Sequence, residues 1–494
     1  MENWNKWKRL TKVKCTIKIK DEVNVKLEGL ALSTRRKLSS TFKYEIPGAR
    51  YMPAVRLGRW DGTVSFFSMG GASYVNLLPE MLPIIEADGY DIDLEDARTE
   101  YEIKFDKVDE NTLSHKVWPK NHPSAGQPIV LRDYQVDTIN KFLEDPQSLQ
   151  EIATGAGKTI ITATLSMMCE PYGRTIVIVP NKSLVTQTEE DYVNLGLDVG
   201  VFFGDRKEFG HKHTICTWQS LNILEKNTKN GDISFTMQDF IEDVNCIMID
   251  EAHMAKADVL KRLLTQPFAH CPIRWGLTGT VPKEDFAFKA LLVSIGEVTN
   301  KIGASELQDK GVLANCHVNI LQLQEYTEYK SYAEELKYLT TNKNRMKYVG
   351  KVISKLAESG NTLVLVDRVK AGEILEENIL DSVFVSGKTK VGDRKDEYDE
   401  VATAKNKVII ATYGVAAVGI NIPRIFNLVL IEPGKSFVRV IQSIGRGIRK
   451  AEDKDFVQIW DITSTAKFAK RHLTARKKWY REANYPFTIE KVDY

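Results

Sequence analysis

A glycine-rich segment carries the first residues whose types and spacing suit chemistry. Residues 153–159 read Ala-Thr-Gly-Ala-Gly-Lys-Thr. Glycines let the backbone curl so that successive N–H groups point at phosphate oxygens, and a helix expected from Ile160 to Cys169 adds its positive N-terminal end. The full phosphate-loop pattern has glycine at position 152, where this chain has Ile152. The residues expected to hold a nucleotide are Thr154, Gly155, Ala156, Gly157, Lys158 and Thr159, with Lys158 on the β- and γ-phosphates and Thr159 on Mg²⁺.

A pair of carboxylates follows a second apolar run. Asp250-Glu-Ala-His253 comes directly after Ile247-Met-Ile. Open α/β sheets bind their ligands at the carboxyl ends of buried parallel strands. Asp250 is therefore expected to hold Mg²⁺, and Glu251 to orient and deprotonate an attacking water. The two segments together predict a site for the hydrolysis of ATP with Mg²⁺.

Two arginines in the last fifth of the chain complete this set. Arg446 and Arg449 lie three residues apart after Gly445, in a second α/β stretch that has no phosphate loop of its own. An arginine that enters from a facing domain stabilises charge on the γ-phosphate and is worth about 10³–10⁵ in rate. The alternative is a surface basic patch, which the Gly-Arg-Gly context disfavours.

Short β-branched runs separated by helical stretches must position these residues. Such runs suit strands that helices bury on both faces of a parallel sheet. They fall in two clusters, about 129–300 and 345–465, which predicts two α/β domains in tandem. The runs begin at Thr175, Cys246, Thr362, Lys407, Leu428 and Phe456.

The first hundred residues predict a small α+β unit that is rich in basic residues. Residues 12–27 alternate basic and apolar side chains, as half-buried strands do. Helices are expected over 29–42 and 79–88, and the Asp-Gly pair within 56–67 predicts a hairpin. The basic side chains either bind duplex phosphates or form a solvated face. The candidates are Lys6, Lys8, Arg9, Lys12, Arg35, Arg36, Lys37, Arg56 and Arg59.

Length sets the number of domains. The chain has 494 residues, which at about 100–200 residues per domain means three or four domains. We expect a helix with one basic face over 467–481, which either contacts nucleic acid or caps the second α/β domain. The predicted division is a basic α+β domain (1–105), a linker (106–128), a first α/β domain that binds the nucleotide (129–310), a second that supplies the arginines (311–465) and a basic C-terminal segment (466–494).

Composition excludes several classes of protein. With 43% hydrophobic and 27% charged residues, the chain is not mostly disordered, collagen-like or a coiled-coil rod. Its net charge of +2 decides nothing about partners. Six scattered cysteines favour reduced, buried thiols over disulfides or a zinc site. The polar N-terminus and the lack of a run of about 18 apolar residues predict a cytoplasmic protein with no membrane partner.

Taken in order, these segments resemble the motifs of superfamily 2 helicases of the DEAH-box-like group. The resemblance covers about residues 129–465 and includes Thr217-Trp-Gln-Ser-Leu221, Leu277-Thr-Gly-Thr280 and Gln442-Ser-Ile-Gly-Arg-Gly-Ile-Arg449. It implies an α/β fold of two tandem RecA-like parallel-sheet domains, preceded here by the small basic α+β domain. It also implies that Gln135 reads adenine, that Gln442 joins the catalytic residues and Gly419 the nucleotide-binding residues. Domain closure driven by ATP would then step along a nucleic-acid strand.

Details of the motifs favour DNA as the nucleic acid. Ser443 stands where RNA-unwinding members carry arginine, and residues 278–280 are Thr-Gly-Thr rather than Ser-Ala-Thr. The whole-chain layout resembles the UvsW-type recombination helicases of tailed phages. That resemblance implies an ATP-dependent DNA helicase or translocase that remodels branched DNA, namely forks, junctions, D-loops and R-loops with their RNA–DNA hybrid. For a phage-encoded chain the compartment would be the host cytoplasm.

Two other functions stay open on the sequence. One is an RNA helicase with the same core. The other is a motor subunit of a restriction or repair complex that uses its N-terminal domain for docking. A nucleotide switch that does not hydrolyse ATP is disfavoured, because the phosphate loop, both carboxylates and both arginines are present.

Overall fold

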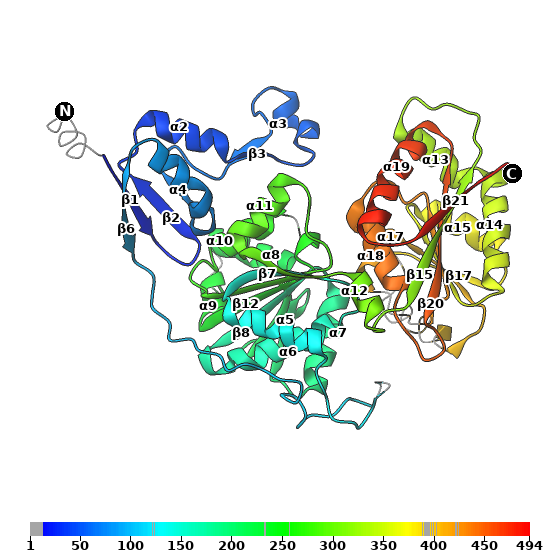
Figure 1. Ribbon diagram of the computed structural model, residues 1–494, viewed down its shortest axis with the longest axis horizontal. Coiled ribbons are helices and arrows are strands. Elements are labelled where there is room, and N and C mark those ends of the chain that lie inside the picture. Colours follow the sequence, from blue (N-terminus) through cyan, green and yellow to red (C-terminus); the bar gives the residue numbers. More distant parts are fainter. Residues whose placement is uncertain are drawn as a thin grey trace. The chain divides into compact units, whose positions relative to one another are not determined.

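The chain forms two compact units in the computed structural model (Figure 1). The first comprises the residues up to Glu151 together with Thr159–Lys301, and the second comprises Ile152–Lys158 with Ile302–Tyr494. Each unit is built on one large sheet of mainly parallel strands. The structure describes residues 13–120, 122, 124–231, 234–255, 257–387, 389, 396, 398, 400, 401, 403–419, 422 and 424–494.

A small four-stranded sheet opens the first unit, in the order β5-β2-β1-β6. The alternation predicted from the sequence is confirmed, because Cys15, Ile17 and Ile19 of β1 are buried while their neighbours face outward. The expected hairpin over 56–67 is wrong: the strand after the Asp-Gly pair, β4, pairs instead with β3. The elements are β1 (Lys14–Ile19), β2 (Asn24–Glu28), α2 (Leu32–Thr41), β3 (Lys43–Glu45), α3 (Pro53–Arg56), β4 (Thr63–Ser65), β5 (Ala72–Tyr74), α4 (Leu78–Ala87) and β6 (Asp91–Asp96).

This small sheet shares a hydrophobic core with helix α11 (Asp285–Ser294). Phe286 and Leu292 of α11 lie in one buried cluster with Phe66 and Ile17 of the N-terminal residues. Polar contacts reinforce the junction, because the Asn76 side-chain amide donates to the Leu292 carbonyl at 2.9 Å. Removal of the N-terminal residues would therefore expose apolar surface on α11.

The first large sheet has the order β10-β9-β11-β8-β12-β13-β7-β14. The pairs from β9 through β7 are parallel, and β10 is antiparallel to β9. Its strands are β7 (Gln147–Ile152), β8 (Arg174–Val179), β9 (Val199–Phe203), β10 (Arg206–Lys207), β11 (His213–Thr217), β12 (Val244–Asp250), β13 (Ile273–Thr278) and β14 (Glu297–Ile302). Its helices are α5 (Asp133–Glu144), α6 (Lys158–Cys169), α7 (Lys182–Asn194), α8 (Trp218–Lys229), α9 (Met237–Ile241), α10 (Ala257–Thr265) and α11.

The second large sheet has the order β17-β18-β16-β19-β20-β15-β21, and its described pairs are parallel. Its strands are β15 (Asn315–Leu323), β16 (Thr362–Val366), β17 (Ser382–Val385), β18 (Val408–Thr412), β19 (Asn427–Ile431), β20 (Phe456–Ser464) and β21 (Phe487–Val492). Its helices are α12 (Ala304–Asp309), α13 (Tyr332–Thr341), α14 (Lys343–Ala357), α15 (Val369–Asn378), α17 (Tyr413–Gly419), α18 (Phe437–Gly447) and α19 (Lys467–Glu482).

Helices cover both faces of the second sheet. Helices α14 and α15 lie on one face, and α17, α18 and α19 on the other (Figure 1). The alternation along β19 agrees with this arrangement, because Val429 packs in the core beneath α14 and α15 whereas Leu428 lies against Gly447 of α18. Gly419 lies on α17, and Gln442 and Arg446 lie on α18, whereas none of the predicted site residues lies on α14.

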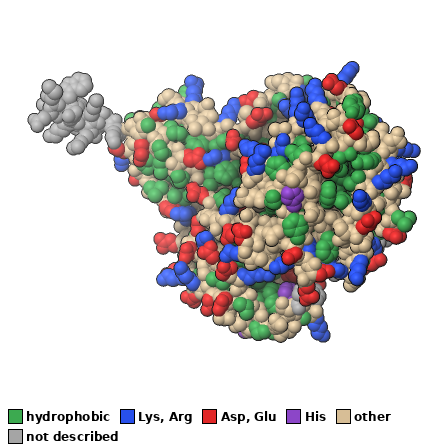
Figure 2. Space-filling model, turned by 45° about the vertical axis from the view of Figure 1, so that its right-hand side comes forward, with side chains coloured by type: hydrophobic (Ala, Val, Ile, Leu, Met, Phe, Trp, Pro, Cys, Tyr) green, Lys and Arg blue, Asp and Glu red, His purple; other side chains and the backbone are tan. Residues whose placement is uncertain are grey.

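The surface and the thiols agree with the composition. Basic and acidic side chains are interspersed over the face that Figure 2 presents. All six cysteines are buried and free, as the sequence predicts. Among the described residues, no helix has both the length and the apolar character needed to cross a membrane.

Candidate active site

The glycine-rich segment forms a tight loop between β7 and α6. Ile152 ends the strand with a fully buried side chain, and Lys158 begins the helix. Gly155 and Gly157 have φ values of +90° and +79°, a left-handed backbone that glycine adopts without strain. The missing glycine at position 152 therefore has a structural reason: that residue is still part of the sheet, and the curl starts after it.

The loop has the chemistry of a phosphate cradle. Lys158 and Thr159 are the first two residues of α6, a twelve-residue helix. Its positive N-terminal end and the curled backbone that precedes it favour phosphate groups. A β-carbon at Gly155 would approach the tip of the Leu313 side chain to 2.7 Å, which a rotation of that side chain would relieve, so it is the φ of +90° that requires glycine there. The residues present thus suit the phosphates of a nucleoside triphosphate.

The two carboxylates follow β12, at the same edge of the first large sheet as this loop. Strand β13 lies between β12 and β7, and all three run parallel. Asp250 is the last residue of β12, and its carboxylate accepts a hydrogen bond from the Glu251 backbone N–H at 2.8 Å. Glu251 is 6% exposed and has φ +50°, a left-handed conformation uncommon for glutamate. Such strain is typical of functional positions.

Hydrogen bonds join Glu251 and His253 to the end of β13. The Thr278 hydroxyl donates to the Thr280 carbonyl at 2.8 Å, so it accepts from His253 Nδ1, which lies 2.5 Å away. The Gly279 backbone N–H in turn donates to the Glu251 carboxylate at 3.3 Å. A shift of the 278–280 segment would therefore move both His253 and Glu251.

The arginine segment lies in the second unit, at the end of α18. Gln442 and Arg446 are on the helix, with Gln442 buried, and Arg449 follows it. Within this unit, Thr154 of the phosphate loop lies against Gly445, and Gly155 lies against Arg449. The second unit thus brings residues of the predicted nucleotide site beside the predicted arginine pair.

Lys454 holds the end of α18 in place. Its ammonium donates to the carbonyls of Gly447 and Arg449 at 2.5 and 2.8 Å, and the residue is 3% exposed. Burial, with a smaller contribution from the charge of Arg449, lowers the pKa of Lys454 to about 7. The sequence offers no signal for this residue, because nothing distinguishes it from the surface lysines around it.

The remaining predicted residues occupy varied environments. Gln135 is buried on α5, and its side-chain oxygen accepts from the Arg132 backbone N–H at 3.0 Å, so it also caps that helix. Gly419 is the last residue of α17.

Among the described residues, no group of three His, Cys, Asp or Glu side chains could hold a metal by itself. A Mg²⁺ ion bound by Thr159, Asp250 and nucleotide phosphates needs no such group. Four of the N-terminal basic candidates, Lys6, Lys8, Arg9 and Lys12, lie outside the described residues.

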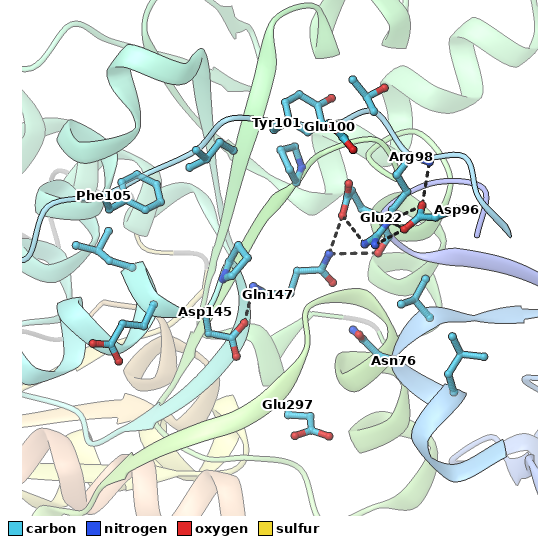
Figure 3. A pocket seen from close by; sticks show the side chains of 18 of the residues that line it. Glu22, Asn76, Asp96, Arg98, Glu100, Tyr101, Phe105, Asp145, Gln147 and Glu297 are labelled. Atoms are coloured by element: carbon cyan, nitrogen blue, oxygen red, sulfur yellow. Dashed lines mark hydrogen bonds and ion pairs between the residues drawn. The ribbon is translucent and has the colours of Figure 1, made fainter. Parts of the chain in front are cut away.

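A separate cavity of about 990 Å³ lies in the first unit between the N-terminal elements and α5 (Figure 3). Buried Glu22 connects the two sides: its carboxylate lies 3.5 Å from the Arg98 guanidinium, and its carbonyl accepts from the Gln147 side chain at 3.2 Å. Burial raises the pKa of Glu22. None of the predicted site residues lines this cavity. The polar groups in its lining connect the N-terminal elements to the start of β7.

Comparisons with known proteins agree with this geometry. Residues 128–283 match the family "Type III restriction enzyme, res subunit", and residues 344–451 match the "Helicase conserved C-terminal domain". The ATP-dependent DNA helicase uvsW of Enterobacteria phage T4 is 26% identical over 476 residues, which is 92% of this chain and 91% of that protein.

Two solved structures share the fold. The ATP-dependent Type ISP restriction-modification enzyme LlaBIII bound to DNA has a TM-score of 0.53 and 14% identity, over 84% of this chain and 34% of that one. Dbp5 of S. cerevisiae bound to RNA and ADP BeF3 has a TM-score of 0.52 and 16% identity, over 74% of this chain and 94% of that one. With both helicase families matched in order on two parallel-sheet domains, the chain belongs to the superfamily 2 helicases.

Proposed function

We propose that this chain is an ATP-dependent DNA helicase or translocase that unwinds or branch-migrates branched DNA in recombination, repair or replication restart. The observation that carries the proposal is that β12, β13 and β7 are parallel neighbours in one sheet, and that Asp250–Glu251, the 278–280 segment and the glycine-rich segment stand at or directly after the carboxyl ends of these strands. The likeness to a phage ATP-dependent DNA helicase over nearly the whole of both chains supports DNA as the nucleic acid. On the same grounds we expect the work to be done in the cytoplasm, that of the host for a phage-encoded chain.

The proposed chemistry assigns each residue one task. Lys158 and the loop N–H groups would bind the phosphates, and Gln135 the adenine. Glu251 would orient the attacking water and accept its proton, while Arg446 and Arg449 would stabilise charge on the γ-phosphate. Mg²⁺, held by Thr159 and Asp250, would neutralise charge between the β- and γ-phosphates when bound. The contact between Gly279 and Glu251 offers a route from hydrolysis to movement.

A second candidate function is a motor subunit of a restriction or repair complex. The match of residues 128–283 to a restriction-enzyme family favours it. The fold itself does not decide between DNA and RNA, because the LlaBIII structure is bound to DNA and the Dbp5 structure is bound to RNA. A direct test is unwinding of a labelled fork with ATP: release of the strand supports the first proposal, and hydrolysis without release by the isolated chain favours the second.

A further inference from the structure

Helix α19 has two faces of opposite character. Ala469, Leu473, Arg476 and Tyr480 are buried at helical spacing and face the second sheet. The opposite face carries exposed basic residues at i, i+3, i+4, i+11 and i+14. They are Lys467, Lys470, Arg471, Lys478 and Arg481, and we call them the α19 basic stripe.

The buried face fixes the helix firmly. Arg476 makes two hydrogen bonds to the Asp461 carboxylate, at 2.7 and 2.9 Å, and a third to the Gly434 carbonyl at 2.7 Å. The Tyr480 hydroxyl adds a bond to the same carboxylate at 2.7 Å. The helix N-terminus is capped as well, because the Glu335 carboxylate accepts from two backbone N–H groups of its first turn. The stripe is thus held on a rigid support, which lowers the entropic cost of binding a partner.

The stripe is poorly neutralised by the protein itself. Within the described part of the chain, no carboxylate forms an ion pair with Lys467, Lys470 or Arg471. Lys478 has an exposed partner, Glu482, at 3.8 Å. A groove of about 640 Å³ is lined by the first three of these residues and also by Thr465 and Thr474. Its acidic residues are Glu325, which is committed to Arg345 at 3.1 Å, and Glu328.

Helix α14 supplies a natural comparison within the same unit. Lys343, Lys347, Lys351 and Lys355 are exposed at four-residue spacing along it. This lysine row lies with α15 on the opposite face of the sheet, whereas α19 shares its face with α17 and α18 (Figure 1). Both helices carry a row of exposed basic residues. They differ in the face of the sheet on which they lie.

We propose that the α19 basic stripe binds the sugar–phosphate backbone of a DNA duplex arm, and that the α14 lysine row does not. At a rise of about 1.5 Å per residue, Lys467 to Arg481 spans about 21 Å, the length of roughly six base pairs. Contacts from cations along such a length to backbone phosphates would position a duplex without reading its sequence. The inference rests on the proposed function, since it names how the same DNA substrate is held outside the motif segments.

The test compares two triple variants of the full chain, in each of which three basic residues are replaced by glutamine. One carries Lys467→Gln, Lys470→Gln and Arg471→Gln, and its matched control carries Lys347→Gln, Lys351→Gln and Lys355→Gln. Affinity for a labelled fork with duplex arms is measured by fluorescence anisotropy over a range of salt concentrations. We expect the α19 variant to bind about ten-fold more weakly at low salt, with a slope of log K against log salt smaller by about 2–3, and the control to match the wild type.

The outcomes separate this inference from the proposed function. Equal affinities and slopes for both variants, or an equal loss in both, would overturn the inference. Failure of the wild-type chain to bind the fork or to be stimulated by DNA would instead overturn the proposed function. Basal ATP hydrolysis and the thermal midpoint, which these exposed side chains should leave unchanged, show that each variant is folded.

Discussion

The two large sheets share an architecture and differ in what stands at their strand ends. In the first, the ends carry the phosphate loop, Asp250 with Glu251, and Thr278. In the second, buried ion pairs occupy the corresponding region: Arg345 lies 2.8 Å from Glu432, directly after β19. Burial raises the pKa of Glu432 to about 7, and Arg345 opposes the shift. Parallel architecture is therefore not sufficient for chemistry, which depends on the residues at the strand ends.

The two sheets also differ in the interactions that fix the segments around their strand ends. In the first sheet, hydrogen bonds from Gly279 to Glu251 and between His253 and Thr278 tie the segment after β12 to the end of β13. The second uses charged residues as supports, with Arg476 on Asp461 fixing α19 and Lys454 fixing the end of α18.

Lys158→Ala should abolish ATP hydrolysis, with kcat falling by about 10³-fold or more, because a charge on the transferred phosphate loses its partner. Steady-state ATPase assays measure the loss. Lys226→Ala, which replaces an exposed lysine of α8, is the control and should hydrolyse ATP normally. Near-normal turnover in the Lys158 variant would mean that the loop is not the nucleotide site.

Arg446→Ala and Arg449→Ala should each lower kcat by about 10³-fold while leaving KM nearly unchanged, because they act on charge that develops in the transition state. Lysine at either position should not restore the rate, since it lacks the planar fork of arginine. If both alanine variants keep the wild-type kcat, the second unit supplies no catalytic arginine and the roles proposed for Arg446 and Arg449 are wrong.

Arg345→Met should destabilise the second unit by about 3–5 kcal/mol, because it leaves Glu325 and Glu432 buried without their counter-charge. Urea unfolding measures the change. Lys351→Met on the same helix is exposed and should cost little. Equal stability of the two variants would show that the buried pairs do not support this sheet.

Lys454 should make stability depend on pH. Its pKa is about 7 in the folded chain and higher when unfolded, so the unfolded state binds more protons above pH 7. The wild type should therefore gain about 1–2 kcal/mol between pH 7 and 9 relative to Lys454→Met, and lose that gain as the pH falls through 7. Parallel unfolding curves at pH 7 and 9 check this, and an identical pH dependence in both proteins would contradict it.

Many of the strands and helices could be predicted from the sequence, because their signals lie in consecutive residues. The strands β8, β12, β16, β18, β19 and β20 were expected because β-branched runs are continuous where helices bury both faces. The helix over 467–481 and its basic face are confirmed as α19. The charged strands β14 and β21 were missed, because half-exposed edge sequences lack that signal.

Long-range pairings could not be predicted. A buried arginine such as Arg345 reads like any base on a polar helix, and its partner Glu432 is 87 residues away. The contact of His253 with Thr278 depends on β12 and β13 being neighbours, which the motifs alone do not show. The shared core of the small sheet and α11 was also hidden, because a proline-rich stretch between them suggested independence.

The most direct test of the account is steady-state ATPase activity with no nucleic acid, single-stranded DNA, duplex DNA, a four-way junction and RNA, at one salt concentration. We predict strong stimulation by DNA, greatest with the junction. Stimulation by RNA alone, or by none of them despite basal turnover, would contradict the proposed DNA-remodelling function.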